Sequence, residues 1–149
     1  MCRFLAYLGS SPIVLSELIE QPSNSLINQS RSPKLCRGTS ADGFGVAWYE
    51  KLGKKPDIYK STKSAWNDLK IPSLMKKIQS TCFLSHVRAA TVGGVSFANC
   101  HPFTFENYSF VHNGTIREVK KYRRNWLSEL DKDLSVFGYC PINGHSFVV

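Results

Sequence analysis

The chain has 149 residues, of which 42% are hydrophobic and 20% charged, and its formal net charge is +8. This length and composition are typical of one globular domain with its own core. The basic residues are scattered rather than gathered in one motif, and no stretch approaches the roughly 20 apolar residues of a membrane helix. We therefore predict neither a nucleic-acid partner nor a membrane partner.

The cysteines favour free thiols. An odd number of five and the absence of a C-x-x-C motif indicate neither a disulfide framework nor a zinc site. The N-terminal apolar run is broken at once by Gly-Ser-Ser-Pro, which is unlike a secretory signal. We therefore expect a cytoplasmic protein without a metal site. The cysteines are Cys2, Cys36, Cys82, Cys100 and Cys140.

The first half of the chain predicts strands separated by a helix and a long loop. The alternation in residues 2–8 predicts a strand. A helix is predicted next, with Ser11 as its N-cap and Pro12 in its first turn. Residues 21–42 lack periodicity and are predicted as a loop. The strands expected to follow lie at residues 43–50 and 57–61.

The second half predicts helices between further strands. A short helix is expected over residues 72–80 and a strand over 81–88, and a strand over 108–114 leads to a helix over 117–131. A last strand is expected within 141–149. This succession predicts a mixed α+β structure, with the whole chain as a single domain.

Cys2 is the first residue that carries possible chemistry. Removal of Met1, which is common before a small residue, would place a thiol and a free α-amine on the same residue. A free thiol has a pKa of about 8.5 and needs a base near neutral pH, whereas an α-amine has a pKa of about 7.7–8.0 and can act as that base. The alternative is that a cysteine stands second by accident.

Two basic residues in or beside predicted loops are further candidates for a functional site. Arg88 ends a predicted strand and precedes small residues, a place from which an arginine can bind a carboxylate through two hydrogen bonds. The alternative is a surface arginine at a strand end. His101 precedes a proline in a predicted loop, and its alternative is a structural histidine.

The pair Asn113–Gly114 is first of all a hairpin turn signal. Here a predicted strand leads in and a predicted helix leads out, which favours a strand-to-helix corner. At such a corner the Asn113 amide and the Gly114 N–H can point at one oxygen atom. That geometry is what an oxyanion hole requires.

Five motifs together resemble the class II glutamine amidotransferase domain in order and approximate spacing: MCR, ADGFGVAWY, SHVRAATVG, NCHPF and VHNGTI. The resemblance is closest to free-standing enzymes that cleave γ-glutamyl amides, and it reaches about residue 120. It implies the fold of an N-terminal-nucleophile hydrolase, an αββα sandwich in which two antiparallel sheets face each other between helices.

The resemblance also implies roles for individual residues. Cys2 would be the nucleophile, with its own α-amine as the base, and Asn113 and Gly114 would form the oxyanion hole. The expected reaction is cleavage of the γ-amide of glutamine or of a γ-glutamyl compound through a thioester on the cysteine, without a cofactor. Residues 42–45 would lie at the edge of the site. The residues implied in substrate binding are Arg88, Thr91 and His101.

The chain departs from the family after the long helix. The family carries an aspartate there that holds the substrate's α-amine, whereas no aspartate follows Gly144 and Ser146 here. Family domains run on by on the order of a hundred residues, so we expect the sandwich to be incomplete at the C-terminus. An inactive remnant or a binding protein of the same family is the alternative function. A small-molecule substrate is the expected partner, and a separate synthase or another protein is a further one.

Overall fold

The computed structural model describes residues 2–33, 38–90, 94–114 and 118–129. Two antiparallel sheets occur in this part of the chain, as expected. The larger sheet has four strands in the order β1-β4-β2-β3, and the smaller one pairs β5 with β6. The strands are β1 (Arg3–Val14), β2 (Phe44–Trp48), β3 (Asp57–Ser61), β4 (Gln79–Val87), β5 (Phe103–Phe105) and β6 (Tyr108–Phe110).

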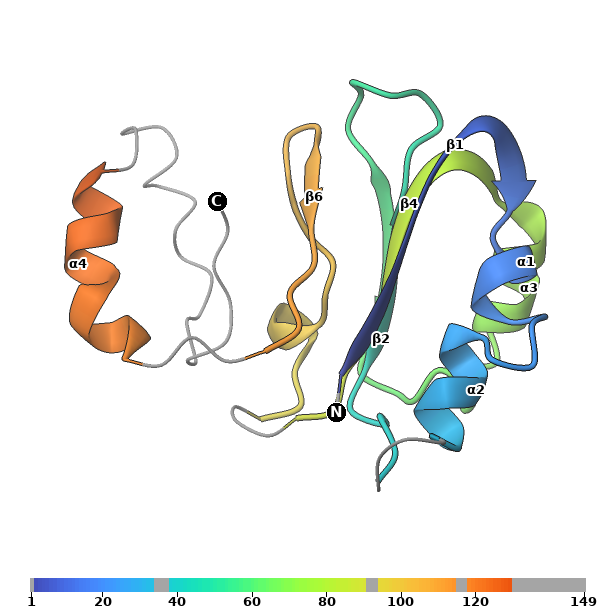
Figure 1. Cartoon of the computed structure of the whole chain (residues 1–149), viewed down its shortest axis with the longest axis horizontal. Coiled ribbons are helices and arrows are strands. Elements are labelled where there is room, and N and C mark those ends of the chain that lie inside the picture. Colours follow the sequence, from blue (N-terminus) through green and yellow to red (C-terminus); the bar gives the residue numbers. More distant parts are fainter. Residues whose placement is uncertain (1, 34–37, 91–93, 115–117, 130–149) are drawn as a thin grey trace.

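Helices lie outside the two sheets. Figure 1 shows α1, α2 and α3 on one side of the four-stranded sheet, the β5–β6 hairpin on the other side, and α4 beyond the hairpin. This order of helices, sheet, sheet and helix confirms the mixed α+β sandwich that was expected. The helices are α1 (Ser16–Ile19), α2 (Leu26–Arg31), α3 (Ile71–Lys77) and α4 (Val119–Glu129), with a 3₁₀ turn at Phe97–Asn99.

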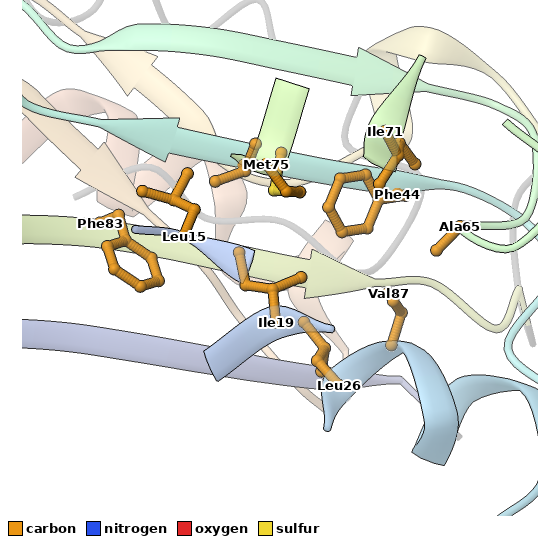
Figure 2. Packing of buried hydrophobic residues seen from close by; sticks show 10 residues of the cluster. Leu15, Ile19, Leu26, Phe44, Ala65, Ile71, Met75, Phe83 and Val87 are labelled. Atoms are coloured by element: carbon orange, nitrogen blue, oxygen red, sulfur yellow. The ribbon is translucent and has the colours of Figure 1, made fainter. Parts of the chain in front are cut away.

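The core lies between the four-stranded sheet and the first three helices (Figure 2). Because side chains alternate along a strand, Phe83 and Val87 of β4 point into this core. The intervening His86 therefore points to the opposite face, toward the hairpin. The buried cluster consists of Leu15, Ile19, Leu26, Phe44, Val46, Ala65, Ile71, Met75, Phe83 and Val87.

The helix predicted from Ser11 and Pro12 is wrong, because both residues belong to β1. The strand resumes its pairing with β4 at Ile13 after an irregularity, and the first helix begins only at Ser16. Within the described residues β1 is an edge strand. A proline is tolerated on an edge strand, where its missing N–H need not cost a ladder hydrogen bond.

The loop predicted over residues 21–42 contains a helix, so this prediction is also wrong. The hydroxyl of Ser25 accepts a hydrogen bond from the Asn28 N–H at 3.2 Å and caps α2. Leu26 and Ser30 of this helix are buried. A helix of six residues is too short to show a periodic pattern.

The strand predicted over 57–61 has the same bounds as β3, and the other predicted elements within the described residues are present with shifted ends. The strand predicted over 108–114 stops at Phe110, and the helix predicted over 72–80 gives way to β4 at Gln79. The long helix occupies Val119–Glu129 of the predicted 117–131. The strand β5 was missed, since three residues carry no pattern of their own. The strand predicted within 141–149 lies outside the described residues.

Two leucines test where the core lies. Leu15 is fully buried and Leu69 is 93% exposed. We expect Leu15→Ala to lower the free energy of unfolding by about 2–5 kcal/mol, because it leaves a cavity in the core. The same change at Leu69 should alter it by less than about 0.5 kcal/mol. Urea denaturation measures both, and equal losses would contradict the packing described here.

Candidate active site

Cys2 lies immediately before β1, beside the end of β4. Arg3 pairs with Val87, so the cysteine faces the residues that follow β4. The Cys2 sulfur accepts a hydrogen bond from the Ala89 N–H at 3.2 Å, and its thiol lies 3.3 Å from the Ala89 carbonyl. Cys2 is a free, half-buried cysteine. Its thiol is thereby fixed against the backbone next to Arg88.

The backbone beyond β4 is also held from the other side. The Asp42 carboxylate accepts a hydrogen bond from the Ala90 N–H at 2.7 Å. The Asp42 N–H donates to the Arg88 carbonyl at 3.0 Å, and the Arg88 N–H donates to the Gly43 carbonyl at 2.8 Å. Asp42 thus fixes the segment that contacts the thiol, a contact that no local sequence pattern signals.

Asn113 reaches Cys2 from the segment that follows the hairpin, and Gly114 is the next residue in the chain. The side-chain amide of Asn113 donates a hydrogen bond to the Cys2 carbonyl at 2.8 Å. Gly114 has a φ of +142°, a conformation that side chains disfavour and glycine permits. The predicted oxyanion pair and the predicted nucleophile are therefore neighbours. The oxyanion role itself stays a prediction.

Arg88 is buried, with only 7% of its surface exposed, so a surface arginine is excluded. Its Nη1 donates a hydrogen bond to the Gly94 carbonyl at 3.2 Å. The guanidinium is thus held by the backbone of Gly94, on the residue that precedes the thiol's contact Ala89. Its binding of a substrate carboxylate stays a prediction. Thr91, the second predicted binding residue, lies outside the described residues.

His101 is buried against a second histidine. Its ring centroid is 4.4 Å from that of His86 and 4.4 Å from that of Phe103. Burial lowers the pKa of His101 to about 3, and burial also lowers the pKa of His86 to about 4. Both rings are therefore neutral near pH 7. Its role in substrate binding stays a prediction.

A pocket of about 270 Å³ opens beside this centre. It lies between β1 and α2, and Arg3, Asn24, Gln29 and Asn113 supply its polar groups. The Arg3 Nη1 donates a hydrogen bond to the Ser40 hydroxyl at 3.1 Å. Sequence reasoning missed this pocket because it did not predict α2, which forms one wall.

Within the described ranges, no group of three or more His, Cys, Asp or Glu residues could hold a metal ion. In that same part of the chain, no helix is both long enough and apolar enough to span a membrane.

Comparison with known proteins gives the family. A profile described as "Glutamine amidotransferases class-II" matches residues 16–133. The chain therefore belongs to the class II glutamine amidotransferases, which confirms the resemblance of its motifs.

Three relatives illustrate the family. The chain is 41% identical over 138 residues to "Probable glutamine amidotransferase DUG3" of Saccharomyces cerevisiae, covering 87% of this chain and 39% of the yeast protein. It is 33% identical over 119 residues to "Gamma-glutamyl-hercynylcysteine sulfoxide hydrolase" of Mycobacterium tuberculosis, covering 78% and 50%. A solved glutamine aminotransferase class-II domain protein of Silicibacter pomeroyi matches with a TM-score of 0.59 and 25% identity, covering 92% and 47%. The chain thus covers half or less of each relative.

A glycine of β2 tests how closely the His101 segment approaches the sheet. A Cβ at Gly45 would collide with the His101 carbonyl, whereas a Cβ at Gly94 would meet nothing within 4 Å. We expect Gly45→Ala to lower the free energy of unfolding by about 1–3 kcal/mol through this overlap. Gly94→Ala should leave it nearly unchanged. Thermal or urea denaturation checks the pair, and a tolerated Gly45→Ala would refute the close approach.

The buried histidines predict a pH dependence of stability. The unfolded chain binds protons at histidine below a pKa of about 6.5, whereas folded His86 and His101 resist protonation down to about pH 4 and about pH 3. The free energy of unfolding should therefore fall as the pH decreases from about 6.5 toward about 4, by at most about 1.4 kcal/mol per pH unit for each histidine. Urea denaturation across this range measures the slope. His101→Phe should reduce it, and an unchanged slope would contradict the assignment.

Proposed function

We propose that the chain hydrolyses the γ-amide of glutamine or of a γ-glutamyl compound, with Cys2 as the nucleophile after removal of Met1. One observation carries the proposal: the cysteine is held by two segments that bear the other candidate residues. Its sulfur contacts Ala89, next to Arg88, and its carbonyl accepts the Asn113 amide at 2.8 Å. Membership of the class II glutamine amidotransferases supports it.

The reaction begins with transfer of the Cys2 thiol proton to its own α-amine, directly or through a water molecule. The sulfur attacks the γ-carbonyl carbon, and the developing oxyanion accepts hydrogen bonds from the Asn113 side-chain amide and the Gly114 N–H. The C–N bond then breaks, and the leaving ammonia or amine takes the proton from the α-ammonium group. A γ-glutamyl thioester remains, and water activated by the same amine releases the acid and the thiol.

Two regions beside the nucleophile would bind different parts of the substrate. Arg88, at the end of β4, would bind the α-carboxylate of the glutamyl part. The pocket between β1 and α2, with Arg3 and three side-chain amides in its lining, would receive a polar amine part. The name of the M. tuberculosis relative describes a hydrolase of a γ-glutamyl compound, which supports a substrate larger than glutamine.

The partner in this proposal is a small molecule, and a separate synthase is its second partner if the released ammonia is used elsewhere. A catalytic thiol has to stay reduced, so we place the activity in the cytoplasm.

Replacement of the nucleophile tests the proposal. We expect Cys2→Ala to lower kcat/KM for glutamate release from glutamine and from γ-glutamyl amides by at least about 10³-fold, because no thioester can form. Cys82→Ala is the matched control, since Cys82 is also a free, half-buried cysteine. It should stay within about twofold of the unchanged protein.

Three other results would count against the proposal. Equal activity of Cys2→Ala and Cys82→Ala would overturn the nucleophile. An unchanged protein that binds glutamine without releasing glutamate would instead be an inactive binding member of the family. Activity on glutamine but on no larger γ-glutamyl amide would contradict the proposed binding of an amine part in the pocket.

A further inference from the structure

Two consecutive peptide groups after β4 each contact Cys2 at one end and Asp42 at the other. The first joins Arg88 to Ala89. Its N–H donates to the Cys2 sulfur at 3.2 Å, and its carbonyl accepts the Asp42 N–H at 3.0 Å. The second joins Ala89 to Ala90. Its carbonyl lies 3.3 Å from the Cys2 sulfur, and its N–H donates to the Asp42 carboxylate at 2.7 Å. The nucleophile and Asp42 therefore lie on opposite sides of the same short backbone segment.

The contacts on the two sides are coupled because a peptide group is rigid. The peptide bond is planar and almost always trans, so its N–H and its carbonyl point in opposite directions and turn together. A peptide group that is held at its Asp42 end is therefore also fixed at its Cys2 end. The Arg88 N–H donates to the Gly43 carbonyl at 2.8 Å and anchors the start of the segment. Asp42 thus limits where the backbone contacts of the thiol can lie.

The carboxylate of Asp42 supplies the part of this restraint that depends on the side chain. The hydrogen bond from the Asp42 N–H is made by the main chain, whereas the bond from the Ala90 N–H needs an acceptor on the side chain. A charge-assisted hydrogen bond of this kind is roughly twice as strong as a neutral one. It lies beyond Val87, the last residue at which β4 pairs with β1 and β2. The carboxylate therefore holds the backbone where the ladder of the sheet has ended.

We propose that Asp42 is a positioning residue, whose carboxylate holds the Ala89–Ala90 peptide group and so orients the Cys2 sulfur toward the γ-carbonyl carbon of the substrate. The inference rests on the proposed function, since it is the attack on this carbon that needs a fixed sulfur. Attack requires aligned reacting atoms about 3–3.5 Å apart, and a displacement of about 1 Å can lower the rate by about 100-fold. Asp42 acts through the backbone and not on the reacting atoms themselves.

Two substitutions at position 42 separate the hydrogen bond from the charge. Asp42→Asn keeps an acceptor oxygen without the negative charge, whereas Asp42→Ala keeps neither. Asp68→Ala is the matched control, because the buried Asp68 carboxylate also accepts a backbone N–H, that of Lys70, at 3.0 Å. It accepts the hydroxyl of Tyr59 as well, and Tyr59 belongs to β3, at the edge of the sheet opposite to β1. The control therefore removes comparable hydrogen bonds away from the thiol.

We expect Asp42→Ala to lower kcat for γ-amide hydrolysis by about 10- to 100-fold with little change in KM, because the substrate still binds but the sulfur is no longer aligned with it. Asp42→Asn should recover most of kcat, and Asp68→Ala should keep it despite a lower stability. Equal losses in Asp42→Ala and Asp42→Asn, or an equal loss in Asp68→Ala, would overturn the positioning role.

Hydrogen exchange of backbone amides, followed by NMR, tests the same contacts without turnover. The Ala90 N–H loses its own acceptor in Asp42→Ala, so it should exchange faster by about 10-fold. The Ala89 N–H keeps its acceptor, the Cys2 sulfur, and it should exchange faster as well because the carboxylate no longer holds the segment. Both amides should exchange at the unchanged rate in Asp42→Asn and in Asp68→Ala.

The exchange rates separate this inference from the proposed function. If the unchanged protein hydrolyses no γ-amide, the proposed function fails, and the two amides still decide whether Asp42 positions the contacts of the thiol. An unchanged exchange rate of the Ala89 N–H in Asp42→Ala would overturn the inference. If Asp42→Ala does not fold, Asp42→Glu takes its place, because it moves the carboxylate by one methylene, and the same outcomes apply.

Discussion

The antiparallel pairing of β1 with β4 is the interaction on which the site depends. It fixes Arg3 opposite Val87, and so places Cys2 beside the backbone of Ala89. A slip of one residue would turn every side chain of β1 to the opposite face. Phe83, fully buried in the core, anchors the other strand of this pair. Packing far from the thiol therefore holds the start of the chain in place.

The two faces of the four-stranded sheet have different roles: one packs the core, and the other carries the candidate site. The helix side carries the apolar cluster, whereas the hairpin side carries the neutral histidines and the approach of Asn113 to Cys2. Gly45 of the sheet allows the second layer to pack closely, because its missing side chain leaves room for the His101 backbone. The site is thus built where the second layer meets the first, and Cys2 and Asn113 are each held by a backbone contact from another segment.

Motifs and apolar strands could be predicted from the sequence, whereas long-range contacts could not. The strand around Val46 is a continuous apolar run, and the strand around Phe83 has an apolar centre, which identified both central strands. Ser11 and Pro12 have the pattern of a helix start, but pairing with β4 outweighed it. The contact between Cys2 and Asn113 joins residues 111 positions apart, and no local pattern encodes such a distance. The resemblance to a family named these residues together, and the structure places Asn113 beside Cys2.

The central claim is that Cys2 becomes the N-terminal residue and that its thiol reacts with a glutamine-like carbon. Intact-mass spectrometry of the purified protein, before and after treatment with a diazoketone analogue of glutamine, tests both parts at once. We expect a mass that lacks Met1 and a single adduct, which peptide mapping assigns to Cys2. A protein that keeps Met1, or an adduct on Cys82 or Cys100 with Cys2 unmodified, would contradict the claim.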